Sequence, residues 1–147
     1  MYVYILVLHI LAATIWTGGH LVLALGFLPR ALKYRSAEII RQFESRFEAI
    51  GIPALVVQAI TGPYLAWRLV PSLHGWFDFA HNPLSHLIAA KLTLLVLTLA
   101  LAINARLRVV PRLSDDNIGT LAVHIVLVTL FGVGFVVIGV MFRTGGF

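Results

Sequence analysis

An uncharged apolar stretch from Val3 to Leu28 constrains the chain more than any other feature. It is long enough for a helix to cross a bilayer, and no charged residue precedes Arg30. His9 and His20 lie eleven residues apart in this stretch, close to three helical turns, so both imidazoles share one stripe with Trp16 between them. They would be about 16 Å apart along the axis. Because polar rings in hydrocarbon need partners, we expect this stripe to face one.

The composition predicts an integral membrane protein. Of the 147 residues, 60% are apolar and only 12% are charged, so lipid must cover most of the surface. Hydrophobic runs and helix-breaking residues predict an all-α, four-helix membrane bundle that forms a single transmembrane domain over residues 1–147. The expected helices are 2–28, 38–70, 83–110 and 116–142. The chain has no cysteine, which excludes disulfides, thiolate metal sites and c-type haem attachment.

Basic residues are distributed unevenly between the expected connections, and this asymmetry predicts the topology. Only Arg68 and Arg143 lie toward one side of the membrane. Because cytoplasmic loops are rich in Lys and Arg, we expect both termini and the 71–82 connection to face the periplasm of a bacterial inner membrane. The basic charge thus reflects topology, and we expect no nucleic-acid partner. The expected cytoplasmic residues are Arg30, Lys33, Arg35, Arg41, Arg46, Arg106, Arg108 and Arg112.

Ionisable residues inside the expected spans are candidates for function, because each is expensive to place in lipid. His20 and His124 lie roughly 13 Å and 12 Å from the cytoplasmic ends of their helices, so we expect them to be level. From the opposite side, His9 is roughly 10 Å deep, Lys91 about 12 Å and His86 about 5 Å. These depths predict two histidine pairs, His20–His124 and His9–His86.

Bis-histidine haem b explains these pairs best. Each haem would take one imidazole from each of two facing helices, with small residues such as Gly19 and Gly51 admitting the ring. One or two haems with Trp16 between them would carry electrons across the membrane, which predicts an oxidoreductase with a quinone or another redox partner. Arg106 and Arg108 would neutralise haem propionates. Lys91 would anchor a propionate or pass a proton, since it lies about 140° around its helix from His86.

Copper is the alternative cofactor. His74, Asp78, His81 and His86 would form a periplasmic imidazole site for Cu(II). A Cu(I) transport path would want thiolates or thioethers, and the chain has no cysteine and only Met1 and Met141. The sequence leaves the number of haems and the oligomeric state, including a homodimer, open.

Three segments resemble the CopD-like (copper-resistance protein D) membrane family: Leu8–Arg30 with its histidines and Leu-Pro-Arg end, Phe43–Phe47, and Arg143–Gly146. The resemblance covers nearly the whole chain. It extends to the related HemJ-type protoporphyrinogen oxidases, which share the four-span plan, a histidine matching His9 and a Lys-Leu pair matching Lys91-Leu92. That resemblance implies haem binding by His9 and a role for Lys91 in porphyrinogen oxidation. His20 and His124 are additions to the HemJ pattern.

Overall fold

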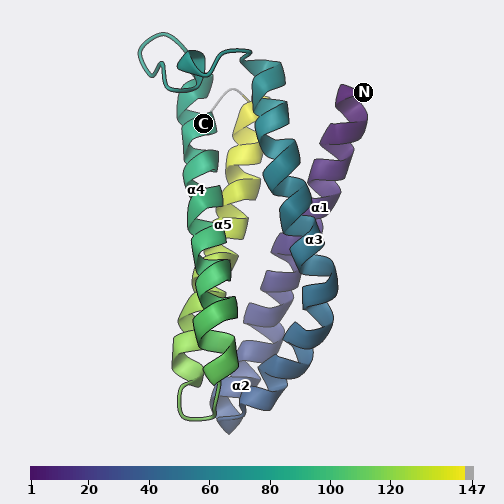
Figure 1. The fold of residues 1–147 in the computed structure, drawn as a ribbon, viewed down its shortest axis with the longest axis vertical. Helices are drawn as coiled ribbons and strands as arrows, with labels where there is room; N and C mark the ends of the chain where they lie inside the picture. The colour runs from purple at the N-terminus through teal and green to yellow at the C-terminus, as the bar shows by residue number, and fades with distance from the viewer. Residues whose placement is uncertain (145–147) are drawn as a thin grey trace.

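The computed structural model describes residues 1–144, and within them four helical segments are long and apolar enough to cross a membrane. They run up and down as an antiparallel bundle, with the start of the first segment and the end of the last at the same end of the molecule (Figure 1). The expected all-α, four-helix membrane bundle is therefore confirmed. The segments are α1–α2 (Tyr2–Tyr34), α3 (Ala37–Leu69), α4 with its following turns (Leu84–Arg112) and α5 (Ile118–Thr144).

The first segment is longer than the sequence predicts. Instead of ending at Leu28, α1 (Tyr2–Val22) continues through a π-helical turn, η1 (Leu23–Phe27), into α2 (Leu28–Tyr34). Pro29 lies in the first turn of α2, where a missing N–H costs little, so it does not stop the helix. Arg35 ends the segment in the left-handed conformation, with φ of 47°.

The turn between α2 and α3 is tied to the connection between α4 and α5. Ser36 occupies the N-cap position of α3, but its side chain makes no capping bond. The N–H of Ala37 instead donates to Oδ1 of Asp115, 2.8 Å away. Asp115 therefore caps α3, and α5 starts at Ile118, two residues after the expected start of the last helix at residue 116. α4 (Leu84–Asn104) reaches this connection through turns η3 (Ala105–Val109) and η4 (Val110–Arg112).

At the opposite end, an ordered connection links α3 to α4. Its short turn η2 (His74–Trp76) is anchored by Trp76, whose Nε1–H donates to the carbonyl of Val70 at 2.9 Å. The amide of Asn82 donates to the carbonyl of Gly75, and its Oδ1 accepts the N–H of Leu84 at the start of α4. This connection lies at the same end of the bundle as the start of α1 and the end of α5 (Figure 1), and we call it the terminal end.

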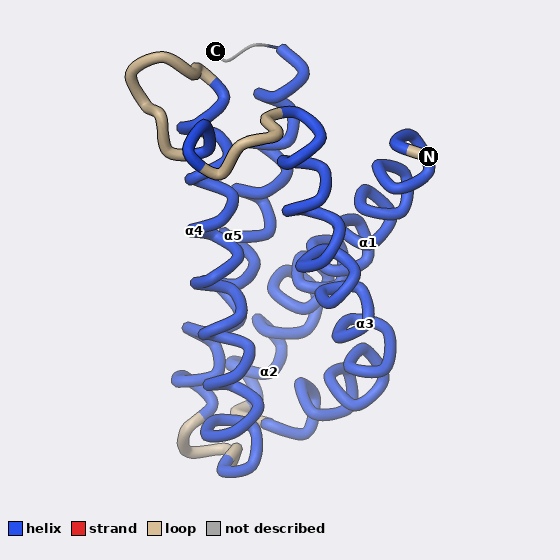
Figure 2. Tube along the Cα trace, turned by 45° about the horizontal axis from the view of Figure 1, so that its top comes forward, coloured by secondary structure: helices blue, strands red, loops and turns tan. Residues whose placement is uncertain are grey.

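The other end, the basic end, contains the best-packed part of the interior. Apolar residues of the first, second and fourth segments form its core, whereas large apolar side chains elsewhere face outward, as lipid contact requires. α1 packs mainly on α3, and α4 packs on α5, so the bundle consists of two helix pairs joined by the α1–α5 contact (Figure 2). The core residues are Leu23, Leu28, Ala31, Ala37, Ile40, Leu113, Ile118, Leu121 and Ile125.

Candidate functional site

Two cavities follow one another along the bundle, and Trp16 lines both. The Lys91 cavity, toward the terminal end, has a volume of about 170 Å³. The His124 cavity, toward the basic end, has a volume of about 130 Å³. All four membrane-spanning segments contribute to each. The cavities therefore separate the sequence-predicted site residues into two groups.

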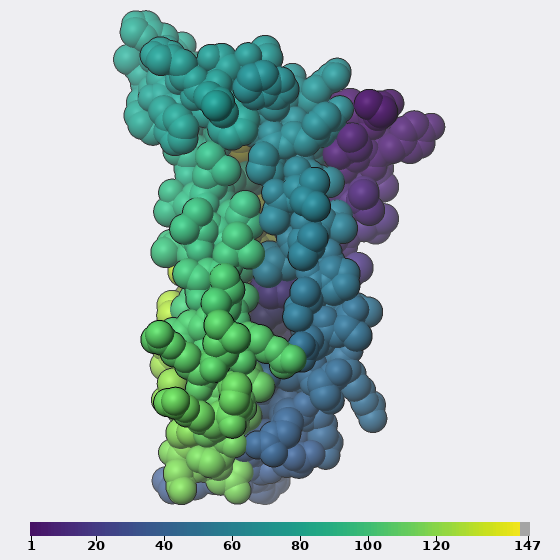
Figure 3. Space-filling view, in the orientation of Figure 1, coloured from purple at the N-terminus to yellow at the C-terminus, as the bar shows by residue number. Residues whose placement is uncertain are grey.

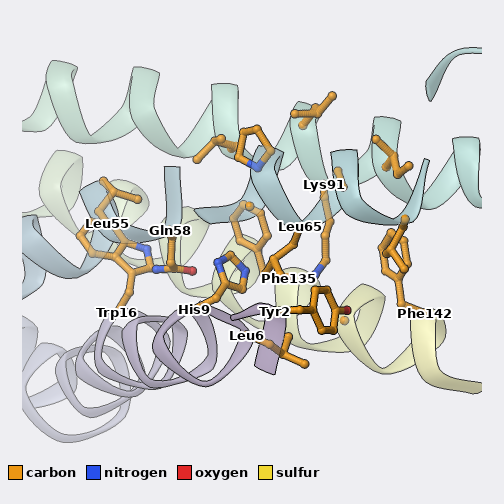
Figure 4. A pocket seen from close by; sticks show the side chains of 18 residues that line it. Tyr2, Leu6, His9, Trp16, Leu55, Gln58, Leu65, Lys91, Phe135 and Phe142 are labelled. Carbon is orange, nitrogen blue, oxygen red and sulfur yellow. The ribbon is translucent and has the colours of Figure 1, made fainter. Parts of the chain in front are cut away.

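The Lys91 cavity brings His9 and Lys91 together (Figure 4). Nδ1 of His9 lies 2.7 Å from Oγ1 of Thr61 on α3. The hydroxyl of Thr61 donates to the carbonyl of Val57 at 2.6 Å, so it accepts its bond from the Nδ1–H of His9. This relay leaves Nε2 of His9 as a hydrogen-bond acceptor. Thr61 is not among the sequence-predicted site residues. A threonine at the same depth as a buried histidine is the signal that could have identified it as the partner of His9.

His86 is not among the residues that line the Lys91 cavity. Its ring stacks on Phe79 of the α3–α4 connection, with centroids 5.0 Å apart. Since His86 and Lys91 point in directions about 140° apart on α4, only one of them can face the interior, and it is Lys91. The structure therefore does not assemble the expected His9–His86 pair.

The His124 cavity brings His20 and His124 together. Nδ1 of His20 donates to the carbonyl of Trp16 at 2.9 Å, and Nδ1 of His124 donates to that of Thr120 at 2.9 Å. Both imidazoles therefore keep the Nε2 lone pair for a ligand, the tautomer that metal-binding histidines use. Nε2 of His124 is buried and has no hydrogen-bond partner within residues 1–144.

The two histidines are less level than depth counting predicts. The hydroxyl of Thr129 lies 3.2 Å from the carbonyl oxygen of His20, so Thr129 is the α5 residue beside His20. His124 precedes Thr129 by five residues, about 7.5 Å along the helix axis. The expected depth of His20 is counted from a helix end at Leu28. Because the first segment continues through a π-helical turn to Tyr34, His20 lies further from the end of its helix than predicted.

Aromatic packing fills the space beside His20. The ring of Phe47 on α3 lies edge-on to His20, with centroids 5.5 Å apart, and the ring of Trp16 lies 4.4 Å from His20 and 6.4 Å from Phe47. A Cβ atom on either Gly19 or Gly51 would collide with the ring of Phe47. The glycines thus make room for Phe47, which the sequence-based site prediction did not include.

Charged side chains also line the His124 cavity. Glu44 and Glu48 of α3 belong to its wall, and Arg106 pairs with Glu48 through contacts of 2.8 Å and 2.9 Å. Arg106 is thus already neutralised by a carboxylate. Arg108, the other expected propionate partner, is exposed and does not line the cavity.

These features allow a test of the haem b prediction. The tautomers of His20 and His124 suit axial ligands, but Phe47 occupies the place between Gly19 and Gly51 that a porphyrin would need. Arg106 is paired with Glu48, and the carboxylate of Glu44 would repel propionates. The residues present therefore do not fit a porphyrin between His20 and His124.

The expected copper site in the α3–α4 connection is not assembled either. His81 pairs with Asp78 at 2.9 Å, while His86 stacks on Phe79. Nowhere in residues 1–144 do three or more His, Asp or Glu side chains converge to hold a metal ion. A metal ion bound by this part of the chain would therefore have fewer than three of these side chains as ligands.

Comparison with known proteins identifies a family. The family model described as copper resistance protein D matches residues 41–142, more than half of the chain. The match includes α4, α5 and most of α3. Of the Arg143–Gly146 segment that resembles this family, Gly145 and Gly146 lie outside the described residues. No curated protein and no solved structure matches the chain.

Proposed function

Because the chain belongs to the copper resistance protein D family, we propose that it binds copper inside the membrane, in the His124 cavity. The observation that carries the proposal is the pair of imidazoles in one cavity wall, His20 and His124, each with Nδ1 tied to a backbone carbonyl. Imidazole nitrogen is a good ligand for copper, and fixing the tautomer prepares Nε2 for coordination.

The charge around the cavity favours a metal cation. Glu44 lines the wall without an ion-pair partner in residues 1–144, whereas the neighbouring Glu48 is paired with Arg106. A carboxylate without an ion pair of its own, beside two imidazoles, attracts a cation, and it disfavours an anionic ligand. Glu44 therefore serves as the charge-balancing group in this proposal, and His20 and His124 serve as the ligands.

The Lys91 cavity argues against a path that carries copper ions through the whole bundle. The amino group of Lys91 has no ion-pair partner within residues 1–144, and it lies in the half of the interior beyond Trp16. An uncompensated ammonium group repels a metal cation at short range. We therefore propose that the protein holds copper in one half of the membrane and does not conduct it.

Copper content of the purified protein tests the proposal. The protein in detergent is loaded with copper, passed through a desalting column and analysed for metal per chain. We expect one copper per wild-type chain and at least about a tenfold loss of affinity in His20→Ala and His124→Ala. His74→Ala and His81→Ala are matched controls, because both residues lie in the α3–α4 connection. Full retention of copper by both His20→Ala and His124→Ala would overturn the proposal.

Haem b does not fit the His124 cavity as it is packed, but a carbonyl-bonded imidazole on each of two helices is also the arrangement of axial haem ligands, so the same protein is tested for haem. Haem binding there requires Phe47 to leave the space between Gly19 and Gly51. A reduced-minus-oxidised absorption spectrum of the same preparation separates the candidates. A sharp α-band that disappears in His20→Ala and His124→Ala would favour haem over copper.

A further inference from the structure

The Lys91 cavity contains polar groups that copper binding does not use. Trp16, Gln58, His9 and Lys91 follow one another along its wall (Figure 4). The indole of Trp16 is only 6% exposed, and its N–H has no hydrogen-bond partner within residues 1–144. A buried donor of this kind is costly in an apolar interior, so this wall of the cavity has unused capacity to bind a polar ligand.

His9 and Lys91 provide complementary hydrogen-bonding groups in this cavity. Since its Nδ1–H is taken by Thr61, His9 offers Nε2 as an acceptor. Lys91 offers a charged donor, and its Nζ contacts the ring face of Phe142 at 5.3 Å from the centroid. Nζ also lies beside Gly139 on α5, where a Cβ would be in ordinary contact with it at 3.5 Å. A ligand with one hydroxyl and one acceptor oxygen would satisfy both residues.

The cavity is open toward the lipid. Because α3 packs on α1 and α4 packs on α5, α3 and α4 leave a hollow between them through which parts of the other two segments are visible (Figure 3). Both helices contribute apolar side chains to the cavity wall, including Leu65 and Ala66 from α3 and Leu92 and Leu95 from α4. A ligand dissolved in the bilayer can therefore enter from the side without crossing a polar surface.

We propose that the Lys91 cavity binds the headgroup of a membrane quinone or its quinol, which enters between α3 and α4. This class of ligand has a flat ring with oxygens on opposite edges, so Lys91 donates to one oxygen and a quinol hydroxyl donates to Nε2 of His9. A volume of about 170 Å³ is below the range of roughly 300–1,000 Å³ for drug-sized ligands. It suits a single ring whose apolar tail stays in lipid. The aromatic walls, Phe135 and Tyr2, supply faces for that ring.

Binding of decylubiquinone to the purified protein tests this proposal. Equilibrium dialysis measures bound quinone, with empty micelles of the same detergent as the blank. We expect saturable binding at one site per chain, and Lys91→Met should lose about 10- to 100-fold in affinity, because a charged hydrogen bond is removed. His9→Phe tests the second contact with reduced decylubiquinol. Lys33→Met, an exposed residue at the basic end, is the matched control.

Two further measurements keep the test decisive. Lys91→Arg retains a charged donor and should bind within about threefold of wild type, whereas loss of affinity through misfolding would also lower the melting temperature of Lys91→Met. Protoporphyrin, a larger ring with carboxylates, is offered in competition. Wild-type affinity for the quinone in both Lys91→Met and Gly139→Leu would overturn the proposal. Lys91-dependent binding of protoporphyrin without any quinone binding would also overturn it. Copper retention in the His124 cavity is measured separately, so the two proposals fail independently.

Discussion

The imidazole of His9 on α1 donates to the hydroxyl of Thr61 on α3 across 2.7 Å, and this bond fixes which nitrogen of His9 faces the Lys91 cavity. His20 and His124 obtain the same tautomer from backbone carbonyls of their own helices. Each histidine inside the bundle interior therefore has one satisfied nitrogen and one available nitrogen. Both cavities therefore have an imidazole nitrogen that is available to a ligand.

Thr61→Val should destabilise the protein, because Nδ1 of His9 loses its acceptor inside the membrane. We expect about 1 kcal/mol, in the range measured for hydrogen bonds between membrane helices. Thermal unfolding in detergent measures the effect. Thr14→Val is the matched control, since Thr14 is exposed and bonds to the carbonyl of Ile10 on its own helix. Equal melting temperatures for the two variants would contradict this role of Thr61.

Asp115→Ala should weaken the basic end, because the N–H of Ala37 at the start of α3 loses its acceptor. Loss of a helix cap costs about 0.5–2 kcal/mol. The measurement is unfolding in increasing denaturant, with Asp116→Ala as the control at the adjacent position. If Asp116→Ala were the more destabilising change, the assignment of the cap to Asp115 would be wrong.

The neighbouring glycines Gly18 and Gly19 should respond differently to alanine. A Cβ at Gly19 collides with the ring of Phe47, whereas a Cβ at Gly18 meets nothing within 4 Å. We expect Gly19→Ala to cost about 1–3 kcal/mol through overpacking and Gly18→Ala to be tolerated. Adding Phe47→Leu to Gly19→Ala should recover part of the loss in the same unfolding assay. No recovery would show that Phe47 does not occupy this space.

The topology can be tested with reporter fusions. Eight of the eleven Lys and Arg residues lie in the helix ends and turns toward the basic end, so we expect that end to face the cytoplasm. A fluorescent reporter at Lys33 should be active, and alkaline phosphatase, which needs the periplasm, should be active at His74. Cytoplasmic activity at His74 would reverse the orientation.

The sequence predicts the fold well because lipid imposes simple requirements. Long apolar runs must be helical to satisfy their backbone, and short connections make neighbouring helices antiparallel. Pro29 shows the limit of this reasoning. A proline ends a helix only where the helix needs a hydrogen bond from the missing N–H. Because a π-helical turn precedes α2, Pro29 lies in a first turn, where that hydrogen bond is not needed.

The site is less predictable because it depends on rotation and on long side chains. The depths expected from the sequence place His9 nearer to Lys91 than to His86. The angle of about 140° between His86 and Lys91 around their helix shows that only one of these two side chains can face the interior. It did not decide which, and the structure selects Lys91. Likewise, the small residues Gly19 and Gly51 indicate close approach but not what approaches, and here it is Phe47. Glu44 is absent from the sequence-based site prediction, although it lines the His124 cavity.

The most direct test of copper binding in the His124 cavity is X-ray absorption at the copper edge on protein loaded with one equivalent of copper. The spectrum counts imidazole ligands in either oxidation state of the metal. We predict scattering from two imidazoles in the wild type and from one in His124→Ala, with no change in His81→Ala. A wild-type spectrum without imidazole scattering, or one that His20→Ala and His124→Ala leave unchanged, would contradict the assignment of the His124 cavity as the copper site.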